Sequence, residues 1–73
     1  MKKIEKLSAL IEMLLSEERT QGVVQNILLW DTRIHNYFEV GKIDYYGKDA
    51  FLNILKIDNY MPNWFFQRLS ELN

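Results

Sequence analysis

Apolar residues recur along this chain at intervals of three and four, which is the spacing of one face of an α-helix. Over residues 3–15 the repeated positions are Ile4, Leu7, Ile11 and Leu14. Continued in the same phase, this stripe would reach only polar residues, so we predict that the first helix ends near residue 15. A second stripe begins in a new phase at Val23 and predicts a helix over 23–40. The two helices should form a helical hairpin.

The C-terminal part of the chain predicts two shorter helices, over residues 48–57 and 62–72. In the first of these, Asp49 lies in the first turn and Lys56 in the last, which suits the helix dipole. Pro62 suits the first position of the second. The predicted fold is therefore all-α, with residues 1–73 forming a single small helical domain.

Residues 37–46 allow a second interpretation, an α+β fold with a β-hairpin in this segment. Gly41 and Lys42 would form its two-residue turn. That pairing places Glu39 opposite Asp44, and like charges directly across a strand pair are unfavourable. Gly41 could instead follow the last residue of the second helix as its terminating glycine. We favour the helix and keep the hairpin as the alternative.

Composition excludes several classes of protein. The chain has no cysteine, so disulfide frameworks, thiolate metal sites and cysteine nucleophiles are ruled out. It has no apolar run close to the roughly 18 residues that a membrane span needs. With a net charge of −1 it also lacks the basic bias of most nucleic-acid-binding proteins. We therefore expect a cytoplasmic protein with no membrane partner, and nucleic acid is the less favoured partner.

The polar residues do not form a recognisable catalytic or metal-binding motif. Asp31, His35 and Glu39 would line one face of a continuous helix. The chain has no second histidine and no cysteine to complete a zinc site, so we interpret this row as a solvated polar stripe. The three glycines are isolated and form no phosphate-binding loop. We expect no metal, no cofactor and no enzymatic activity.

The aromatic residues indicate a binding surface. All ten lie between residues 30 and 66. Successive helical residues are about 100° apart, so three aromatic residues in a row at 64–66 cannot all face the core. Tyrosine and tryptophan are frequent among the residues that dominate protein interfaces. The predicted partner-binding residues are Tyr45, Tyr46, Tyr60, Trp64 and Phe66.

The first helix could also mediate self-association. A core of this size rarely supplies more than about 3–5 kcal/mol, so a small chain without disulfides gains from a partner. Leu7, Ile11 and Leu14 would pack either within the hairpin or against a second copy. The sequence leaves a monomer and a homodimer equally open.

We therefore expect a non-enzymatic protein–protein interaction module that binds its partner stoichiometrically. Lys, Ile, Asn and Tyr, whose codons are AT-rich, supply 23 of the 73 residues. This bias indicates a low-GC bacterium, its bacteriophage or a mobile element. In that setting, an inhibitor or regulator of a host macromolecule is the natural example.

The alternative function is a dimeric transcriptional regulator. Residues 50–72 have the layout of a helix-turn-helix, with a short helix, a polar turn and a second helix. Asn63, Gln67 and Arg68 would then face DNA. Arg68 is the only basic residue of that second helix, whereas a recognition helix normally offers several. This alternative therefore ranks below protein binding.

Overall fold

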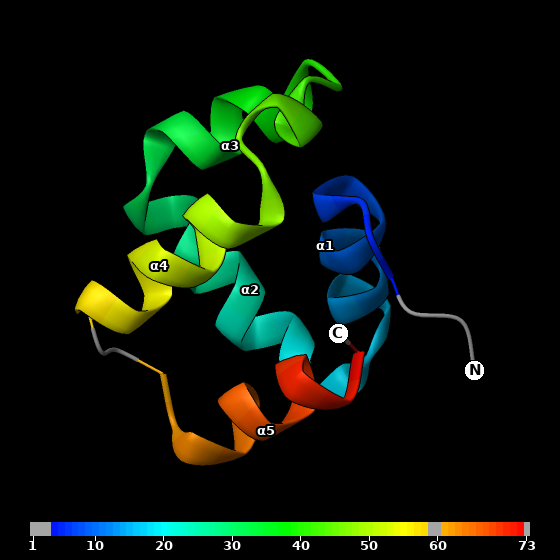
Figure 1. The fold of residues 1–73 in the computed structure, drawn as a ribbon, viewed down its shortest axis with the longest axis vertical. Helices are drawn as coiled ribbons and strands as arrows, with labels where there is room; N and C mark the ends of the chain where they lie inside the picture. Colours follow the sequence, from blue (N-terminus) through cyan, green and yellow to red (C-terminus); the bar gives the residue numbers. More distant parts are fainter. Residues whose placement is uncertain (1–3, 59–60, 73) are drawn as a thin grey trace.

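The structure is a computed structural model that describes residues 4–58 and 61–72. Within these residues, all of the regular secondary structure is helical (Figure 1). In chain order the elements are α1 (Leu7–Ser16), α2 (Glu18–Trp30), α3 (Thr32–Glu39), the 3-10 turn η1 (Ile43–Tyr45), α4 (Lys48–Asp58) and α5 (Asn63–Leu72). The predicted all-α fold is confirmed. No helix within these ranges combines the length and apolar composition that crossing a bilayer requires.

The helix pair at the start of the chain is joined by a single residue, Glu17. α1 packs against α2, as the predicted hairpin requires. The buried hydroxyl of Thr20 donates a 2.6 Å hydrogen bond to the carbonyl oxygen of Leu14, which links the first turn of α2 to the end of α1. α1 begins at Leu7 rather than near residue 3, and the backbone N–H of Ile4 instead donates to the carbonyl oxygen of Leu72.

The predicted second helix over 23–40 is wrong in two respects. It begins earlier, because α2 runs from Glu18 to Trp30, and it is two helices, because α3 begins at Thr32 after the extended residue Asp31 (φ −107°, ψ 95°). The apolar spacing continues across this bend, since Ile27 and Ile34 lie seven residues apart and both are buried. Periodicity alone therefore could not reveal the bend.

The β-hairpin alternative for residues 37–46 is also wrong. α3 ends at Glu39 with Val40 as its C-cap, and Gly41 takes the left-handed conformation (φ 73°) that the predicted terminating glycine requires. The N–H of Gly41 donates to the carbonyl oxygen of Phe38, and the N–H of Lys42 donates to that of Tyr37 at 2.7 Å. These bonds form a Schellman motif. These N–H and carbonyl groups are therefore bonded within the helix end and are not available for the hydrogen bonds between two strands of a β-hairpin.

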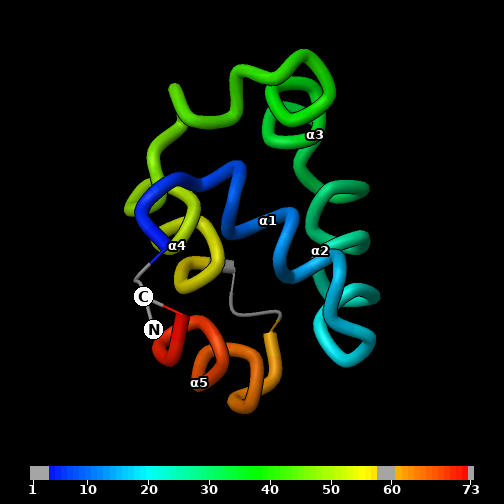
Figure 2. Tube along the Cα trace, turned by 90° about the vertical axis from the view of Figure 1, so that its right-hand side faces the viewer, coloured from blue at the N-terminus to red at the C-terminus, as the bar shows by residue number. Residues whose placement is uncertain are grey.

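Every α-helix contributes to one core. The core residues of α1 lie three and four apart, as predicted, and those of α5 follow the same rule. α3 and η1 lie at one end of the molecule and α5 at the other (Figures 1 and 2). The buried hydrophobic residues are Leu7, Leu10, Ile11, Leu14, Val24, Ile27, Ile34, Ile43, Phe51, Leu55, Phe65, Leu69 and Leu72.

Candidate functional site

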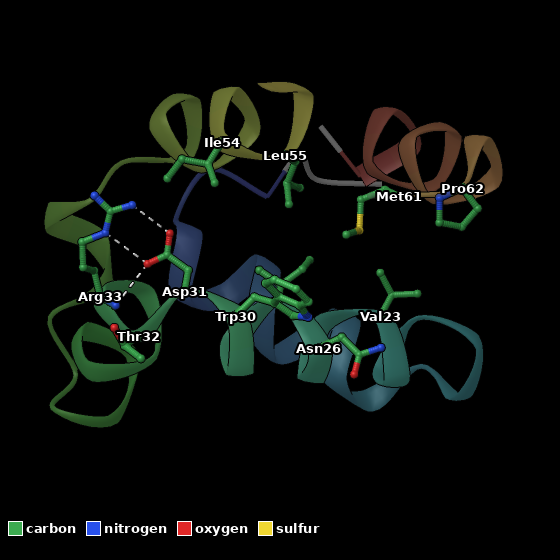
Figure 3. Close-up of a pocket in the computed structure, with 11 residues that line it drawn as sticks. Val23, Asn26, Trp30, Asp31, Thr32, Arg33, Ile54, Leu55, Met61 and Pro62 are labelled. Atoms are coloured by element: carbon green, nitrogen blue, oxygen red, sulfur yellow. Dashed lines mark hydrogen bonds and ion pairs between the residues drawn. The ribbon is translucent and has the colours of Figure 1, made fainter. Parts of the chain in front are cut away.

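An open groove of about 580 Å³ lies between α2 and α4 (Figure 3). Val23, Ile27 and Trp30 form the wall on α2. Ile54 and Leu55 form the facing wall on α4. These five side chains are apolar or aromatic, so the groove offers a hydrophobic surface bounded by two helices. We call it the α2–α4 groove.

The depth of the groove and its mouth differ in exposure. Ile27 and Leu55, one from each wall, belong to the buried core. Trp30 is 76% exposed, and its indole ring is directed from α2 into the space between the two helices (Figure 3). Leu29, the preceding residue of α2, is 77% exposed. Trp30 therefore extends the apolar surface of the groove from these buried residues out to solvent.

The two ends of the groove differ in chemistry. Met61 and Pro62, from the segment before α5, close one end. Asp31, Thr32 and Arg33 close the other end at the bend between α2 and α3. Three of the four polar lining residues are therefore at the bend, and the fourth, Asn26, lies on the α2 wall.

Asp31 holds that bend through four hydrogen bonds. Its carboxylate accepts from the backbone N–H groups of Arg33 (3.1 Å) and Ile34 (3.2 Å), so it is the N-cap of α3. It also accepts from Nε (3.2 Å) and an Nη (3.0 Å) of the Arg33 guanidinium. The hydrogen bonds from Arg33 and the N–H of Ile34 lower the pKa of Asp31. The side chain of Asp31 is 14% exposed and that of Arg33 69%, so the carboxylate lies behind the guanidinium.

The predicted partner-binding residues are not brought together. Tyr45, in η1, is 84% exposed. Tyr46 is half-buried and packs against the ring of Tyr37, with centroids 5.6 Å apart. Tyr60 lies outside the described residues. The η1 segment lies beside α3, at the end of the molecule away from α5 (Figures 1 and 2).

The two predicted partner-binding residues on α5 are both half-buried. The guanidinium of Arg19 lies 4.2 Å from the centroid of the Trp64 ring, a cation–π contact that covers part of the indole. Phe66 packs against the core. The aromatic residues of the C-terminal part thus belong to two separate regions, and a single partner surface built from all of them stays a prediction.

The residues predicted for self-association lie inside one copy of the chain. Leu7, Ile11 and Leu14 are fully buried in its core. They therefore pack the hairpin, and a homodimer built on these side chains would require α1 to leave α2. Any surface for a second copy on the folded chain must be formed by other residues.

The predicted DNA-facing residues are only partly available. Asn63 and Gln67 are exposed on α5. The guanidinium of Arg68, however, donates to Glu17 (Nε to Oε1, 3.0 Å; a second N–H to Oε2) and to Glu71 (3.0 Å). These carboxylates raise the pKa of Arg68 and neutralise the one cation that α5 could offer to a phosphate.

The polar stripe of Asp31, His35 and Glu39 does not form a metal site. The Asp31 carboxylate is committed to the start of α3, while His35 and Glu39 are exposed. Within residues 4–58 and 61–72, no three histidine, aspartate or glutamate side chains gather closely enough to hold a metal ion.

Sequence reasoning missed the α2–α4 groove and its principal residue, Trp30. One signal for the bend was present, because aspartate is among the preferred residues at a helix N-cap. No signal for the groove was present, because its walls come from segments about thirty residues apart in the chain.

No protein-family model, curated protein sequence or solved structure matches this chain.

Proposed function

We propose that this protein is a non-enzymatic interaction module that binds another protein stoichiometrically, with the α2–α4 groove as its docking surface. The observation that carries the proposal is the exposure of Trp30 (76%) at the mouth of a groove whose walls are mostly apolar. Water contact with a large indole is unfavourable, and a partner that covers it recovers that free energy. Tryptophan is also among the residues that contribute most to binding at protein interfaces.

The extent of the apolar surface supports a macromolecular partner over a small ligand. The groove volume of about 580 Å³ would suit either. Leu29, however, exposes a further large apolar side chain on the same helix, outside the lining of the groove. A small molecule held between α2 and α4 would leave Leu29 in water, whereas a protein surface can cover both regions.

The charged residues of the groove support binding rather than catalysis. Asp31 and Arg33 are the ionisable residues of its lining, and they bond to each other. The carboxylate also holds two backbone N–H groups of α3. A side chain committed in this way serves the fold. In the low-GC phage or mobile-element setting predicted from composition, such a module would inhibit or regulate a host macromolecule by occupying its surface.

The test is affinity capture from a low-GC bacterial lysate with and without nuclease, read by mass spectrometry. Trp30→Ala removes the indole from the groove, and Val40→Ala is the control, since it trims an exposed apolar side chain that does not line the groove. We expect one nuclease-resistant protein, bound stoichiometrically by the parent and by Val40→Ala. Trp30→Ala should weaken its binding by about 2 kcal/mol or more, roughly 30-fold.

Two results would contradict the proposal. Equal capture by Trp30→Ala and the parent would remove the groove from binding, provided that circular dichroism shows both chains folded. Recovery of DNA, with all proteins lost on nuclease treatment, would instead favour the regulator. Substitution of Asn63 and Gln67 should then reduce DNA binding, and binding should weaken steeply with salt.

A further inference from the structure

We infer that Asp31 regulates the α2–α4 groove by holding the bend between α2 and α3, and that loss of its hydrogen bonds lets the two helices join into one. The effect of Asp31 on partner binding rests on the proposed function, because the groove is the proposed docking surface. The effect of Asp31 on the bend between α2 and α3 can be tested without a partner.

The bend is confined to one residue. On its N-terminal side, the N–H of Asp31 donates to the carbonyl oxygen of Ile27 at 2.9 Å, as in an uninterrupted helix. On its C-terminal side, the N–H of His35 donates to the carbonyl oxygen of Asp31 at 3.0 Å. Helical hydrogen bonding thus reaches Asp31 from both sides, and few bonds would have to change to make one helix.

The Asp31 carboxylate takes the bonds that a joined helix would use. In a continuous helix the N–H groups of Arg33 and Ile34 would donate to the carbonyl oxygens four residues earlier. Here both donate to the side chain of Asp31 instead. The carboxylate therefore competes directly with the helical alternative, and the Arg33 guanidinium holds it in place.

The sequence around the bend is compatible with both forms. Residues 18–39 contain no proline, and their apolar spacing predicts a helix that runs straight through residue 31. Ile34, which is fully buried, opposes joining, because a straight helix would draw it away from the core. The bent form is thus favoured by the Asp31 cap and by the packing of Ile34 together, and removing the cap shifts the balance.

The bend determines the shape of the groove. Thr32 and Arg33 immediately follow Asp31, so these two lining residues change direction relative to α2 if the helices join. One end of the groove would then open. A partner that fits the bent form would bind a variant without the cap more weakly, in proportion to the fraction of bent molecules. Asp31 is accordingly a positioning residue for binding.

Paired spin labels can measure the bend in the full chain. Because the protein has no cysteine, Gln21→Cys and Glu39→Cys, both at exposed positions, can be labelled without further changes. In one straight helix these residues, 18 apart, would lie about 27 Å from each other. The bent parent should show a single shorter distance. Asp31→Ala should add a second population near the straight-helix value.

Conservative variants separate the cap from other effects. Asp31→Asn keeps a capping oxygen and should restore the parent distance. Asp31→Glu keeps the charge but favours a helix interior over a cap, so it should show the longer population even if Asp31→Ala fails to fold. Thr32→Ala, next to the bend, is the matched control and should resemble the parent. A single short distance in a folded Asp31→Ala or Asp31→Glu chain would overturn the inference.

The two proposals can fail separately. If Asp31→Glu shows a longer distance between the spin labels while Trp30→Ala still captures the partner, Asp31 holds the bend but the groove is not the docking surface. If the distance is unchanged while Trp30→Ala loses the partner, the groove is the docking surface but Asp31 does not regulate it.

Discussion

The carboxylate of Asp44 accepts two hydrogen bonds from Ser8, one from its backbone N–H at 2.9 Å and one from its hydroxyl at 3.0 Å. Lys6, the residue at the N-cap position of α1, makes no side-chain capping bond. Asp44, which lies in η1, 36 residues after Ser8, therefore supplies the missing cap. The bond from the N–H of Ser8 is the main reason that the pKa of Asp44 is lowered.

Substitution of Asp44 should destabilise the fold. Asp44→Ala removes both acceptors and leaves the start of α1 without a cap, so the melting temperature should fall. Ser8→Ala removes only the hydroxyl bond and should have a smaller effect. Glu12→Ala, an exposed position of α1, is the control and should be close to neutral. A larger effect for Ser8→Ala than for Asp44→Ala would contradict capping by Asp44.

Stability should decrease in acid. The pKa values of Glu17, Asp31 and Asp44 are all lowered in the folded protein, from 4.5 for the glutamate and 3.8 for the aspartates. As the pH falls, the carboxylates of the unfolded chain therefore bind protons before those of the folded chain. The stabilisation is fully present above the pKa values of the unfolded chain and is lost as the pH falls through the lowered pKa values of the folded chain. The urea midpoint should therefore begin to fall as the pH drops below about 4.5 and should keep falling as the folded carboxylates become protonated.

The contribution of Glu17 to this acid dependence can be isolated. The hydrogen bond from Arg68 is the largest cause of the lowered pKa of Glu17. Glu17→Gln removes the titrating group, so the urea midpoint of this variant should fall less steeply in acid than that of the parent. An identical acid profile would show that the pair between Glu17 and Arg68 does not contribute.

Thr20 should be sensitive to the loss of its hydroxyl. It is buried, and its Oγ1 donates to the carbonyl oxygen of Leu14. Thr20→Val keeps the shape but leaves this carbonyl without its donor, which should cost about 1–3 kcal/mol of unfolding free energy. Thr20→Ser keeps the donor and loses a methyl group, at about 1 kcal/mol. Urea denaturation compares the two, and a serine variant less stable than the valine variant would contradict the role of this bond.

Two glycines should respond in opposite directions to alanine. Gly22 lies inside α2, and an added Cβ would meet no atom within 4 Å, so Gly22→Ala should stabilise by about 0.5–1 kcal/mol. Gly41 has equal space but a φ of 73°. Gly41→Ala should therefore destabilise by about 1–2 kcal/mol. Denaturation of both variants tests this, and a destabilised Gly22→Ala would show that the sign does not follow backbone conformation.

Much of the fold could be predicted because a helix with one apolar face has a pattern of apolar residues that can be recognised within a short stretch of sequence. The stripe of α1, the end of α3 at Gly41 and the existence of α4 and α5 each depend on residues within a few turns of one another. The candidate site could not be predicted in this way. Trp30 continues the apolar pattern of α2, so the sequence gives no sign that it reaches solvent, and Tyr46 and Trp64 belong to regions that the fold separates.

The amino-acid sequence by itself determined that the chain is helical, where most of its helices lie and which faces are buried, because helix formation and amphipathic spacing are local properties. Only the tertiary structure decided the bend at Asp31, the cap that Asp44 gives to α1 and the groove between α2 and α4. Each depends on which of several chemically similar partners a side chain contacts. The packing of the segments decides this, since a carboxylate can cap a helix only where the fold brings the N–H groups of that helix within reach.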